Sequence, residues 1–427
     1  MSGIAKYVLS KNGSVSGSDL IKNDVTDELE KLGAKIFNEH KERNVLNADA
    51  VVVTSAVSVD NPEVLEAKRR GVDVFDRSKV LGDIISLYKN SVAIAGCHGK
   101  TTATAMISEI LIEGGKDPTV FIGGDYVRAK RFRLGNSDVA VAEACEYKKN
   151  LLDIDAKIAV VLNLDNDHMD CYSNMKEMTE TFRKFTEKSL AVLNADDLYS
   201  DKLFNSATVT FGIDRPATYT AKSIKYNGRG YSFSLCKHYR PIARINLQVF
   251  GWHNVYNALA ACAVADLLGV STRAVKRALE GFCGVKRRNE YLGEKYGVQY
   301  FADYAHHPSE IAATLSAYRQ TGQRFFVVFQ PHTYSRTKFL MGEFVNAFKD
   351  VDSLIIYKTY AAREDFDVDG SAEKLYENLK KEGCDCKYVD DIENLNALLS
   401  SLKGYDKALV LGAGDIYEIF NDCVLKK

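Results

Sequence analysis

The stretch VAIAGCHGKTTATAMISEIL, residues 92–111, runs from an apolar strand through a glycine turn into a helix-forming segment. Glycines allow tight turns in which successive N–H groups face phosphate oxygens, and a helix start adds positive potential. The common phosphate loop reads G-x-x-x-x-G-K-[ST], but position 94 is Ile94, so this loop is shorter. We interpret it as a short nucleotide site. The alternative is an ordinary glycine turn beside a surface lysine.

Different residues of the loop are predicted to bind phosphate and metal. Lys100 is placed to reach the β- and γ-phosphates of a nucleotide, and the Thr101 hydroxyl to hold Mg²⁺. The residues assigned to the nucleotide here are Gly96, Cys97, His98, Gly99, Lys100, Thr101 and Thr102.

Apolar runs alternate with amphipathic segments along the whole chain, which predicts parallel sheets covered by helices. The expected strands lie in residues 48–56, 91–96, 138–144, 157–164, 324–330, 353–360 and 407–414. Residues 217–238 instead alternate by twos around Asn227-Gly228, which predicts an antiparallel hairpin. We expect three units with boundaries near 88 and 286, namely 1–88, 89–286 and 287–427.

Composition excludes several classes of function. The 427 residues carry 56 basic and 57 acidic side chains, a net charge of −1, so no strong positive field favours nucleic acid. No apolar run approaches the roughly 18 residues of a membrane span. The nine cysteines form neither a disulfide framework nor a zinc pattern, which predicts reduced thiols in a cytoplasmic protein.

Two acidic motifs follow predicted strands of the second unit. Glu143 in EACEY is a candidate Mg²⁺ ligand, because the carboxyl ends of parallel strands face the ligand crevice and hard cations prefer oxygen. NLDNDHMD, residues 163–170, concentrates acids around His168 after a predicted strand, which suggests metal or phosphate chemistry. A solvated loop acid and a capped polar helix start are the respective alternatives.

Other polar clusters lie further along the chain. His253, Asn254 and Asn257 open an apolar helix, where they could meet an adenine edge. FADYAHHPSEI (301–311) and FQPHTYSRT (329–337) each follow a predicted strand and predict a site for a carboxylate and an amine. A zinc site is the competing interpretation, which the histidine spacing and the absence of a neighbouring cysteine disfavour. The residues of interest in these two motifs are Asp303, Tyr304, His306, His307, His332 and Arg336.

Taken in order, GCHGKTT, EACEY, NLDNDHMD, GWHNVYNALAA, GVKRRNE, DYAHHPSE, FQPHTYSRT and LGAGDI resemble the Mur ligases over essentially the whole chain. The resemblance implies three α/β domains. These are a Rossmann-like N-terminal domain, a central P-loop ATPase domain with a mostly parallel sheet plus a small antiparallel sheet, and a Rossmann-like C-terminal domain. They would bind the UDP-sugar, ATP and the amino acid, respectively.

The resemblance also implies a reaction. ATP phosphorylates the carboxylate of UDP-N-acetylmuramate, and L-alanine attacks the acyl phosphate to form an amide, with Mg²⁺ as cofactor. The implied sites are Lys100 and Thr101 for phosphate and metal; Glu143 and His168 for metal; His253, Asn254 and Asn257 for adenine; Arg288 and Asp303 for the nucleotide; Tyr304, His306, His332 and Arg336 for alanine and the muramate arm; Ser18 and Asp19 for the uridine side.

The chain departs from the family pattern at several positions. It begins MSGIAKYVLS, as though inside the glycine-rich turn that usually ends GMSGLA, so we expect the first strand to be missing through a late start assignment. Cys145, Ala305 and Asn289 replace the usual Asp, Gly and Phe. Three other functions stay open: a ligase for recycled murein peptides, a non-catalytic nucleotide-binding relative, and a generic P-loop phosphotransferase.

Overall fold

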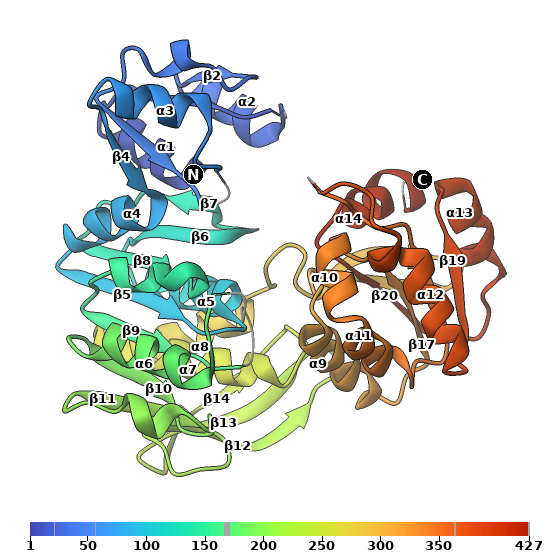
Figure 1. Ribbon diagram of the computed structural model, residues 1–427. Coiled ribbons are helices and arrows are strands. Elements are labelled where there is room, and N and C mark those ends of the chain that lie inside the picture. The colour runs from blue at the N-terminus through green and yellow to red at the C-terminus, as the bar shows by residue number, and fades with distance from the viewer. Residues whose placement is uncertain (21, 56, 166–170, 363, 426–427) are drawn as a thin grey trace. The chain divides into compact units, whose positions relative to one another are not determined.

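The computed structural model describes residues 1–20, 22–55, 57–165, 171–362 and 364–425. Contacts divide the chain into two compact units (Figure 1). Unit 1 comprises Met1–Gln248 and His253–Cys283, and unit 2 comprises Val249–Trp252 and Gly284–Lys427. Within the described ranges, no helix has the length and apolar character needed to cross a membrane.

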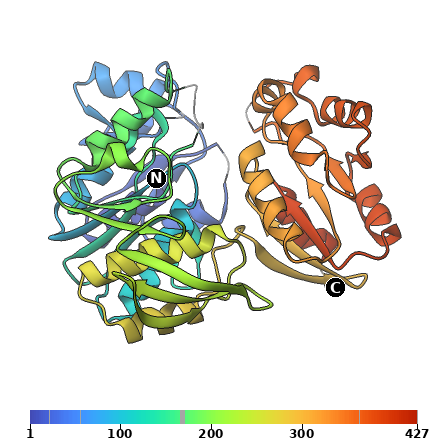
Figure 2. The same cartoon turned by 90° about the horizontal axis from the view of Figure 1, so that it is seen from below.

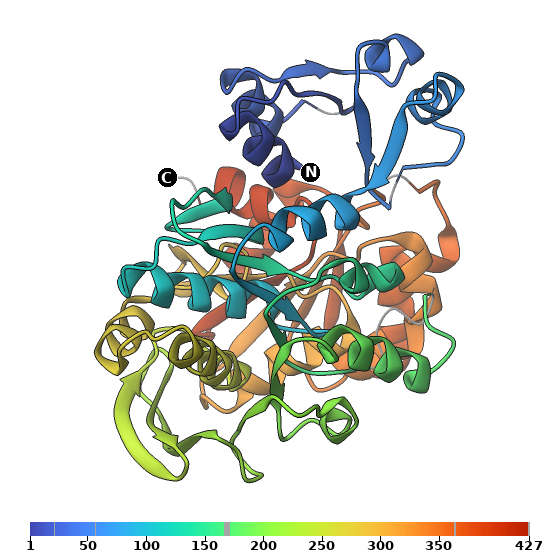
Figure 3. The same ribbon diagram turned by 90° about the vertical axis from the view of Figure 1, so that its left-hand side faces the viewer.

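The N-terminal part of unit 1 contains two parallel strand pairs, each joined through a helix (Figure 3). Its elements are α1 (Ser2–Ser10), β1 (Ser16–Ser18), α2 (Asp24–Lys31), β2 (Lys35–Phe37), η1 (Glu42–Val45), β3 (Ala50–Val53), α3 (Pro62–Arg69), β4 (Asp73–Asp76) and α4 (Arg77–Ser86). Strand β1 pairs with β2, and β3 with β4. Asn23 and Asn61 cap α2 and α3 by accepting hydrogen bonds from N–H groups of the first turn.

The rest of unit 1 is built on a ten-stranded sheet. In spatial order its strands are β14 (Arg240–Asn246), β13 (Tyr231–Lys237), β12 (Tyr219–Tyr226), β11 (Thr208–Gly212), β10 (Leu190–Asn194), β9 (Ile158–Val161), β5 (Asn90–Ala95), β8 (Val139–Glu143), β6 (Thr119–Tyr126) and β7 (Ala129–Arg133). The pairs from β11 to β6 are parallel. The predicted hairpin forms as β12 and β13, and it continues the large sheet through a short parallel pairing of β12 with β11.

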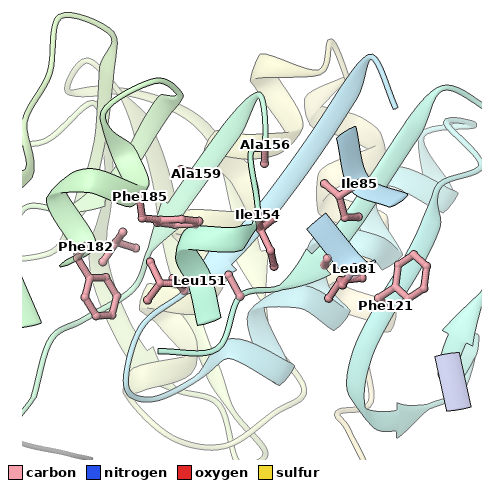
Figure 4. Packing of buried hydrophobic residues seen from close by; sticks show 14 of the residues in the cluster. Leu81, Ile85, Phe121, Leu151, Ile154, Ala156, Ala159, Phe182 and Phe185 are labelled. Carbon is pink, nitrogen blue, oxygen red and sulfur yellow. The ribbon is translucent and has the colours of Figure 1, made fainter. Parts of the chain in front are cut away.

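The central strands β5, β8, β9 and β10 are buried on both faces of the large sheet, as their continuous apolar sequences predict. On one face, Ala93 and Ala95 of β5 join a core with residues from α4, η2 (Tyr147–Asp153) and α6 (Met175–Thr186). Figure 4 shows Leu81, Leu151 and Phe182 of this core. Gly82 permits the close approach of α4 to η2, because an added Cβ would lie 1.9 Å from the carbonyl oxygen of Asp153.

Three helices pack together in unit 1. Helix α5 (Lys100–Glu113) contacts both α7 (His253–Leu267) and α8 (Thr272–Gly281). Because α5 begins at the end of the phosphate loop and α7 begins at His253, this packing brings the two polar helix starts together.

Unit 2 contains a six-stranded sheet with helices on both faces (Figure 2). Its strands, in spatial order, are β15 (Glu290–Lys295), β16 (Val298–Asp303), β20 (Lys407–Leu411), β17 (Phe325–Phe329), β18 (Leu354–Tyr357) and β19 (Cys386–Val389). Its helices are α9 (Pro308–Arg319), α10 (Tyr334–Phe339), α11 (Met341–Phe348), η4 (Val368–Gly370), α12 (Ala372–Lys381), α13 (Ile392–Ser401), α14 (Ile416–Ile419) and η5 (Phe420–Val424). All pairings are parallel except that of β15 with β16.

Side chains of β17 alternate between two hydrophobic cores. Val327 and Phe329 point into the core beneath α9, α11 and α12, whereas Phe326 and Val328 join the core beneath α13 and η5. A strand that alternates in this way fixes both layers of helices on the sheet.

The short segment Val249–Trp252 belongs to unit 2, although the residues on either side belong to unit 1. Its Phe250 ring packs against Tyr318 with the ring centroids 4.8 Å apart. The ammonium of Lys407 lies over the same two rings, 5.8 Å from the centroid of Phe250 and 5.3 Å from that of Tyr318. The chain therefore passes between the units three times.

Candidate active site

The loop after β5 has the backbone that a phosphate site requires. Gly96 and Gly99 adopt φ angles of +138° and +85°, which side-chain-bearing residues rarely adopt. Gly99 is also tightly packed, because an added Cβ would lie 2.7 Å from Oδ1 of Asn257. Asn257 in turn donates to Asn254 at 3.0 Å. The structure thus brings the predicted phosphate loop and two of the predicted adenine-side residues together.

Lys100 is held at the start of α5 by three groups. Its ammonium donates to the carbonyl oxygens of Gly96, at 2.6 Å, and Cys97, at 3.2 Å. Both carboxylate oxygens of Glu146 lie 2.9 Å from it. The Glu146 side chain is 1% exposed and that of Lys100 is 16% exposed. Removing one partner of such a buried pair typically costs about 3–5 kcal/mol, so the pair fixes the ammonium in place.

The charge of Lys100 is maintained by this pair. Burial lowers the pKa of a lysine, but the Glu146 carboxylate outweighs burial and raises the pKa of Lys100 above its usual range. Lys100 is therefore cationic at neutral pH.

Glu143 lies at the end of β8, beside the loop. It accepts hydrogen bonds from the Thr101 hydroxyl at 3.2 Å and from the N–H of Gly123 at 2.6 Å. The donors gathered here are oxygens, and Mg²⁺ commonly takes one or two protein oxygens together with water and phosphate oxygens. Thr101 and Glu143 therefore fit a nucleotide-bound magnesium ion. Among the described residues, no group of three or more His, Cys, Asp or Glu side chains could hold a metal ion without such a ligand.

The NLDNDHMD segment supports the loop from the other side. Asn163 accepts from the N–H of His98 at 2.8 Å and donates to its carbonyl at 3.0 Å. Asp165 lies 3.0 Å from Nε2 of His98. These contacts fix the middle of the loop. His168, the predicted metal ligand of this segment, lies outside the described residues.

Ser18 belongs to a polar cluster in the N-terminal part of unit 1. Its hydroxyl donates to Glu63 at 2.6 Å and lies 2.8 Å from Nδ1 of His40. Asn44 donates to the second oxygen of Glu63 at 2.7 Å. Asp19 follows at the end of β1, where its N–H donates to the carbonyl of Phe37. Sequence reasoning named only Ser18 and Asp19 here.

In unit 2, Asp303 is the last residue of strand β16 and Tyr304 follows it. Asp303 accepts from the N–H groups of Asn289 and Ala305, each at 2.9 Å. Burial raises the pKa of Asp303, and the guanidinium of Arg288 opposes that rise. Arg288 lies 5.2 Å from the ring centroid of Tyr304. The predicted pair Arg288 and Asp303 is therefore assembled at one strand end.

His306, His332 and Arg336 also lie together in unit 2. The two imidazole centroids are 5.8 Å apart, and His332 stacks on Tyr360 at 5.4 Å. Arg336 donates to the carbonyl of His332 at 2.7 Å, and His306 contacts the carbonyl of Tyr304 at 2.8 Å. The ends of β16 and β17 thus join both predicted motifs into one cluster.

His306 gives this cluster a defined pH dependence. Burial lowers the pKa of His306 to about 4, Glu310 opposes this shift, and Arg336 adds to it. The unfolded chain takes up this proton near pH 6.5, the folded chain only near pH 4. The contribution of neutral His306 to the free energy of unfolding is therefore complete above pH 6.5. It is lost as the pH falls toward 4, a loss of about 3 kcal/mol.

We predict that wild-type protein loses more stability between pH 7.5 and pH 4.5 than the variant His306→Gln. The measurement is the urea midpoint of each protein at both pH values, followed by a fluorescence signal from unit 2. His238→Asn, at the exposed turn between β13 and β14, should behave as wild type. Equal losses in wild type and His306→Gln would contradict the assignment.

Sequence reasoning missed Glu146, Tyr360 and Glu364. Glu146 is the second acid of EACEY, so its position was available, but its burial against Lys100 depends on the fold. Tyr360 follows β18, and Glu364 accepts from the N–H of Ser335 at 2.8 Å. Tyr360 is the last residue of the strand predicted over 353–360, but the strand ends at Tyr357 and leaves Tyr360 in the following loop.

Comparison with known proteins identifies the family. Three family models match: "Mur ligase family, catalytic domain" over residues 1–89, "Mur ligase middle domain" over 94–265, and "Mur ligase, glutamate ligase domain" over 287–414. The UDP-N-acetylmuramate–L-alanine ligase of Acetivibrio thermocellus is 41% identical over 431 residues, covering 98% of this chain and 92% of the relative. The enzyme of the same name from Clostridium beijerinckii is 40% identical, with coverage of 97% and 93%.

Solved structures agree. A UDP-N-acetylmuramate–alanine ligase from Thermotoga maritima superposes with a TM-score of 0.83 at 29% identity, covering 98% of this chain and 94% of that one. A murein peptide ligase from Psychrobacter arcticus gives a TM-score of 0.72 at 22% identity, with coverage of 99% and 95%, and shares the fold. The chain therefore belongs to the Mur ligase family of ATP-dependent ligases, and the predicted three-domain α/β fold is confirmed.

Proposed function

We propose that this chain joins L-alanine to the muramate carboxylate of UDP-N-acetylmuramate, with ATP as the energy source, in the synthesis of peptidoglycan precursors. The observation that carries the proposal is the phosphate loop with its fixed cation, Lys100, in a chain whose full-length relatives bear that activity in their names. We propose the cytoplasm as its compartment and residues 1–88, 89–286 and 287–427 as the UDP-sugar, ATP and amino-acid domains.

The chemistry requires two steps. A carboxylate oxygen is a poor leaving group, so the γ-phosphoryl group of ATP is first transferred to the muramate carboxylate. The uncharged amine of L-alanine then attacks the carbonyl carbon, and the tetrahedral intermediate collapses with release of inorganic phosphate. The amide keeps one N–H, and a proton leaves the amine nitrogen. Most of the catalysis is positioning and neutralisation of charge.

The nucleotide residues have distinct proposed tasks. The loop N–H groups of residues 96–102 and the Lys100 ammonium stabilise the charge on the transferring phosphoryl group. Thr101, Glu143 and His168 would hold Mg²⁺, which neutralises phosphate charge when bound. His253, Asn254, Asn257, Arg288 and Asp303 are assigned to the rest of ATP.

The acceptor residues lie in two further clusters. Arg336 would bind a carboxylate through its planar guanidinium, since this fork matches two carboxylate oxygens. His306 stays neutral at physiological pH, so it can accept a hydrogen bond or a proton from the amine. Tyr304 and His332 line the same cluster, and Ser18 and Asp19 are assigned to the uridine side.

The test is phosphate release by the purified 427-residue chain with ATP, Mg²⁺ and UDP-N-acetylmuramate. We expect release to depend on L-alanine and to be lost when Mg²⁺ is withheld. Replacing alanine by the tripeptide L-alanyl-γ-D-glutamyl-meso-diaminopimelate separates this activity from that of a murein peptide ligase. Release with the tripeptide alone would overturn the proposal in favour of that function. No release with either amine would favour a non-catalytic relative.

A further inference from the structure

Glu146 carries a buried charge that the proposed reaction leaves without a task. Its main-chain carbonyl accepts hydrogen bonds from the Tyr172 hydroxyl at 2.6 Å and from the N–H of Lys149 at 2.9 Å. Its side chain is 1% exposed, with both oxygens 2.9 Å from Nζ of Lys100. The backbone anchors and the burial leave this carboxylate little freedom to move.

The ammonium of Lys100 uses all three of its N–H donors within the protein. Two donate to the loop carbonyls of Gly96 and Cys97, and the third to Glu146. A phosphate oxygen can therefore bind this ammonium only if one of these acceptors is released. The three acceptors differ, because two are neutral carbonyls on a glycine-containing loop and one is a buried anion.

Releasing the carboxylate would cost more than releasing a carbonyl. The bond from the ammonium to the Glu146 carboxylate joins two opposite charges and is stronger than a bond to a neutral loop carbonyl. The ion pair should therefore persist when the nucleotide binds, and a loop carbonyl should give way to the phosphate.

We propose that Glu146 is a positioning residue, which holds the Lys100 ammonium at the phosphate end of the loop while ATP binds and reacts. It acts through Lys100 and makes no contact with the nucleotide. This inference rests on the proposed function only in taking ATP as a substrate.

The test is a double-mutant cycle on ATP affinity. Binding of ATP with Mg²⁺ is measured by titration calorimetry for wild type, Glu146→Gln, Lys100→Ala and the double variant. Glutamine keeps the size and an acceptor oxygen but removes the charge. We expect Glu146→Gln to weaken ATP binding about tenfold in the wild-type background and less than about twofold when Lys100 is alanine, because the two residues act as one unit. We also expect kcat to fall by about 10²-fold.

Two further variants keep the test decisive. Glu146→Asp retains the charge but withdraws the carboxylate by one methylene, so it should fold and still lose most of the kcat that Glu146→Gln loses. Glu66→Gln is the matched control, because Glu66 is also buried and bonds Arg69 through both oxygens, at 2.6 and 2.7 Å. It should leave ATP affinity unchanged.

Weakening by the same factor in both backgrounds would overturn the inference, because Glu146 would then act independently of Lys100. So would unchanged or tighter ATP binding in folded Glu146→Gln. These titrations contain neither UDP-sugar nor alanine, so their outcome is separate from the question of which amine the enzyme uses. If the proposed function were wrong, phosphate release would not depend on L-alanine.

Discussion

Lys100→Ala should lower the kcat for alanine-dependent phosphate release by about 10³-fold, the scale seen when a charge that stabilises a phosphoryl transition state is removed. The ammonium lies at the start of α5, in contact with the loop that would surround the phosphates. Lysine is a compact cation whose charge meets the phosphoryl oxygens, and no neutral residue replaces that interaction. The measurement is kcat at saturating ATP, UDP-N-acetylmuramate and alanine.

The same substitution should also destabilise the protein, because the buried Glu146 carboxylate would lose the ammonium of Lys100. We expect a loss of about 3–5 kcal/mol in the free energy of unfolding of Lys100→Ala. The double variant Lys100→Ala/Glu146→Gln should recover much of that stability but none of the activity. Lys79→Ala removes an exposed lysine that pairs with Asp83 and serves as the control. Activity within tenfold of wild type in Lys100→Ala would contradict the site.

Arg336→Ala should lower kcat/KM for L-alanine by at least about 10²-fold while leaving ATP affinity within about twofold of wild type. The guanidinium is anchored by its bond to the carbonyl of His332, and it lies beside the imidazole of the same residue. An arginine held in this way presents its remaining N–H groups in a fixed plane, which suits a carboxylate. Initial rates over a range of alanine concentrations supply the measurement.

Two comparisons sharpen the prediction for Arg336. Arg336→Lys keeps the charge but not the planar fork, so it should recover only part of the lost kcat/KM. Lys338→Ala removes an exposed cation of the same helix, which pairs with Asp367 and Asp369, and should behave as wild type. Unchanged kcat/KM in Arg336→Ala would favour a generic P-loop phosphotransferase instead.

Most of the fold could be predicted because its strands are continuous apolar runs. Six of the seven predicted strand segments contain a strand of the structure, and the seventh, 91–96, overlaps β5 (Asn90–Ala95). The turn at Asn227-Gly228 joins two antiparallel strands. The attachment of this hairpin to the large sheet was not predictable. It rests on the short pairing of Phe211 with Tyr219 and of Gly212 with Thr220, which leaves no distinctive pattern in the sequence.

The candidate site divides in the same way. Thr101 and Glu143 could be predicted because each ends or follows an apolar strand in a recognisable motif, and the structure places them in contact. The role of Glu146 could not be predicted, because a glutamate is ordinarily exposed and only the folded structure shows that this one is buried. The assignments of individual residues to substrates remain predictions that the substitutions above would test.

Because Val249–Trp252 belongs to unit 2, the protein cannot be cut into its two units at a single point in the sequence. A fragment that begins at Gly284 lacks Phe250. The ring of Tyr318 and the ammonium of Lys407 then lose the aromatic ring that they contact. Such a fragment should express poorly alone and gain stability when a synthetic peptide containing residues 249–252 is added. The C-terminal third of the chain therefore packs around four residues that lie earlier in the sequence, between two segments of unit 1.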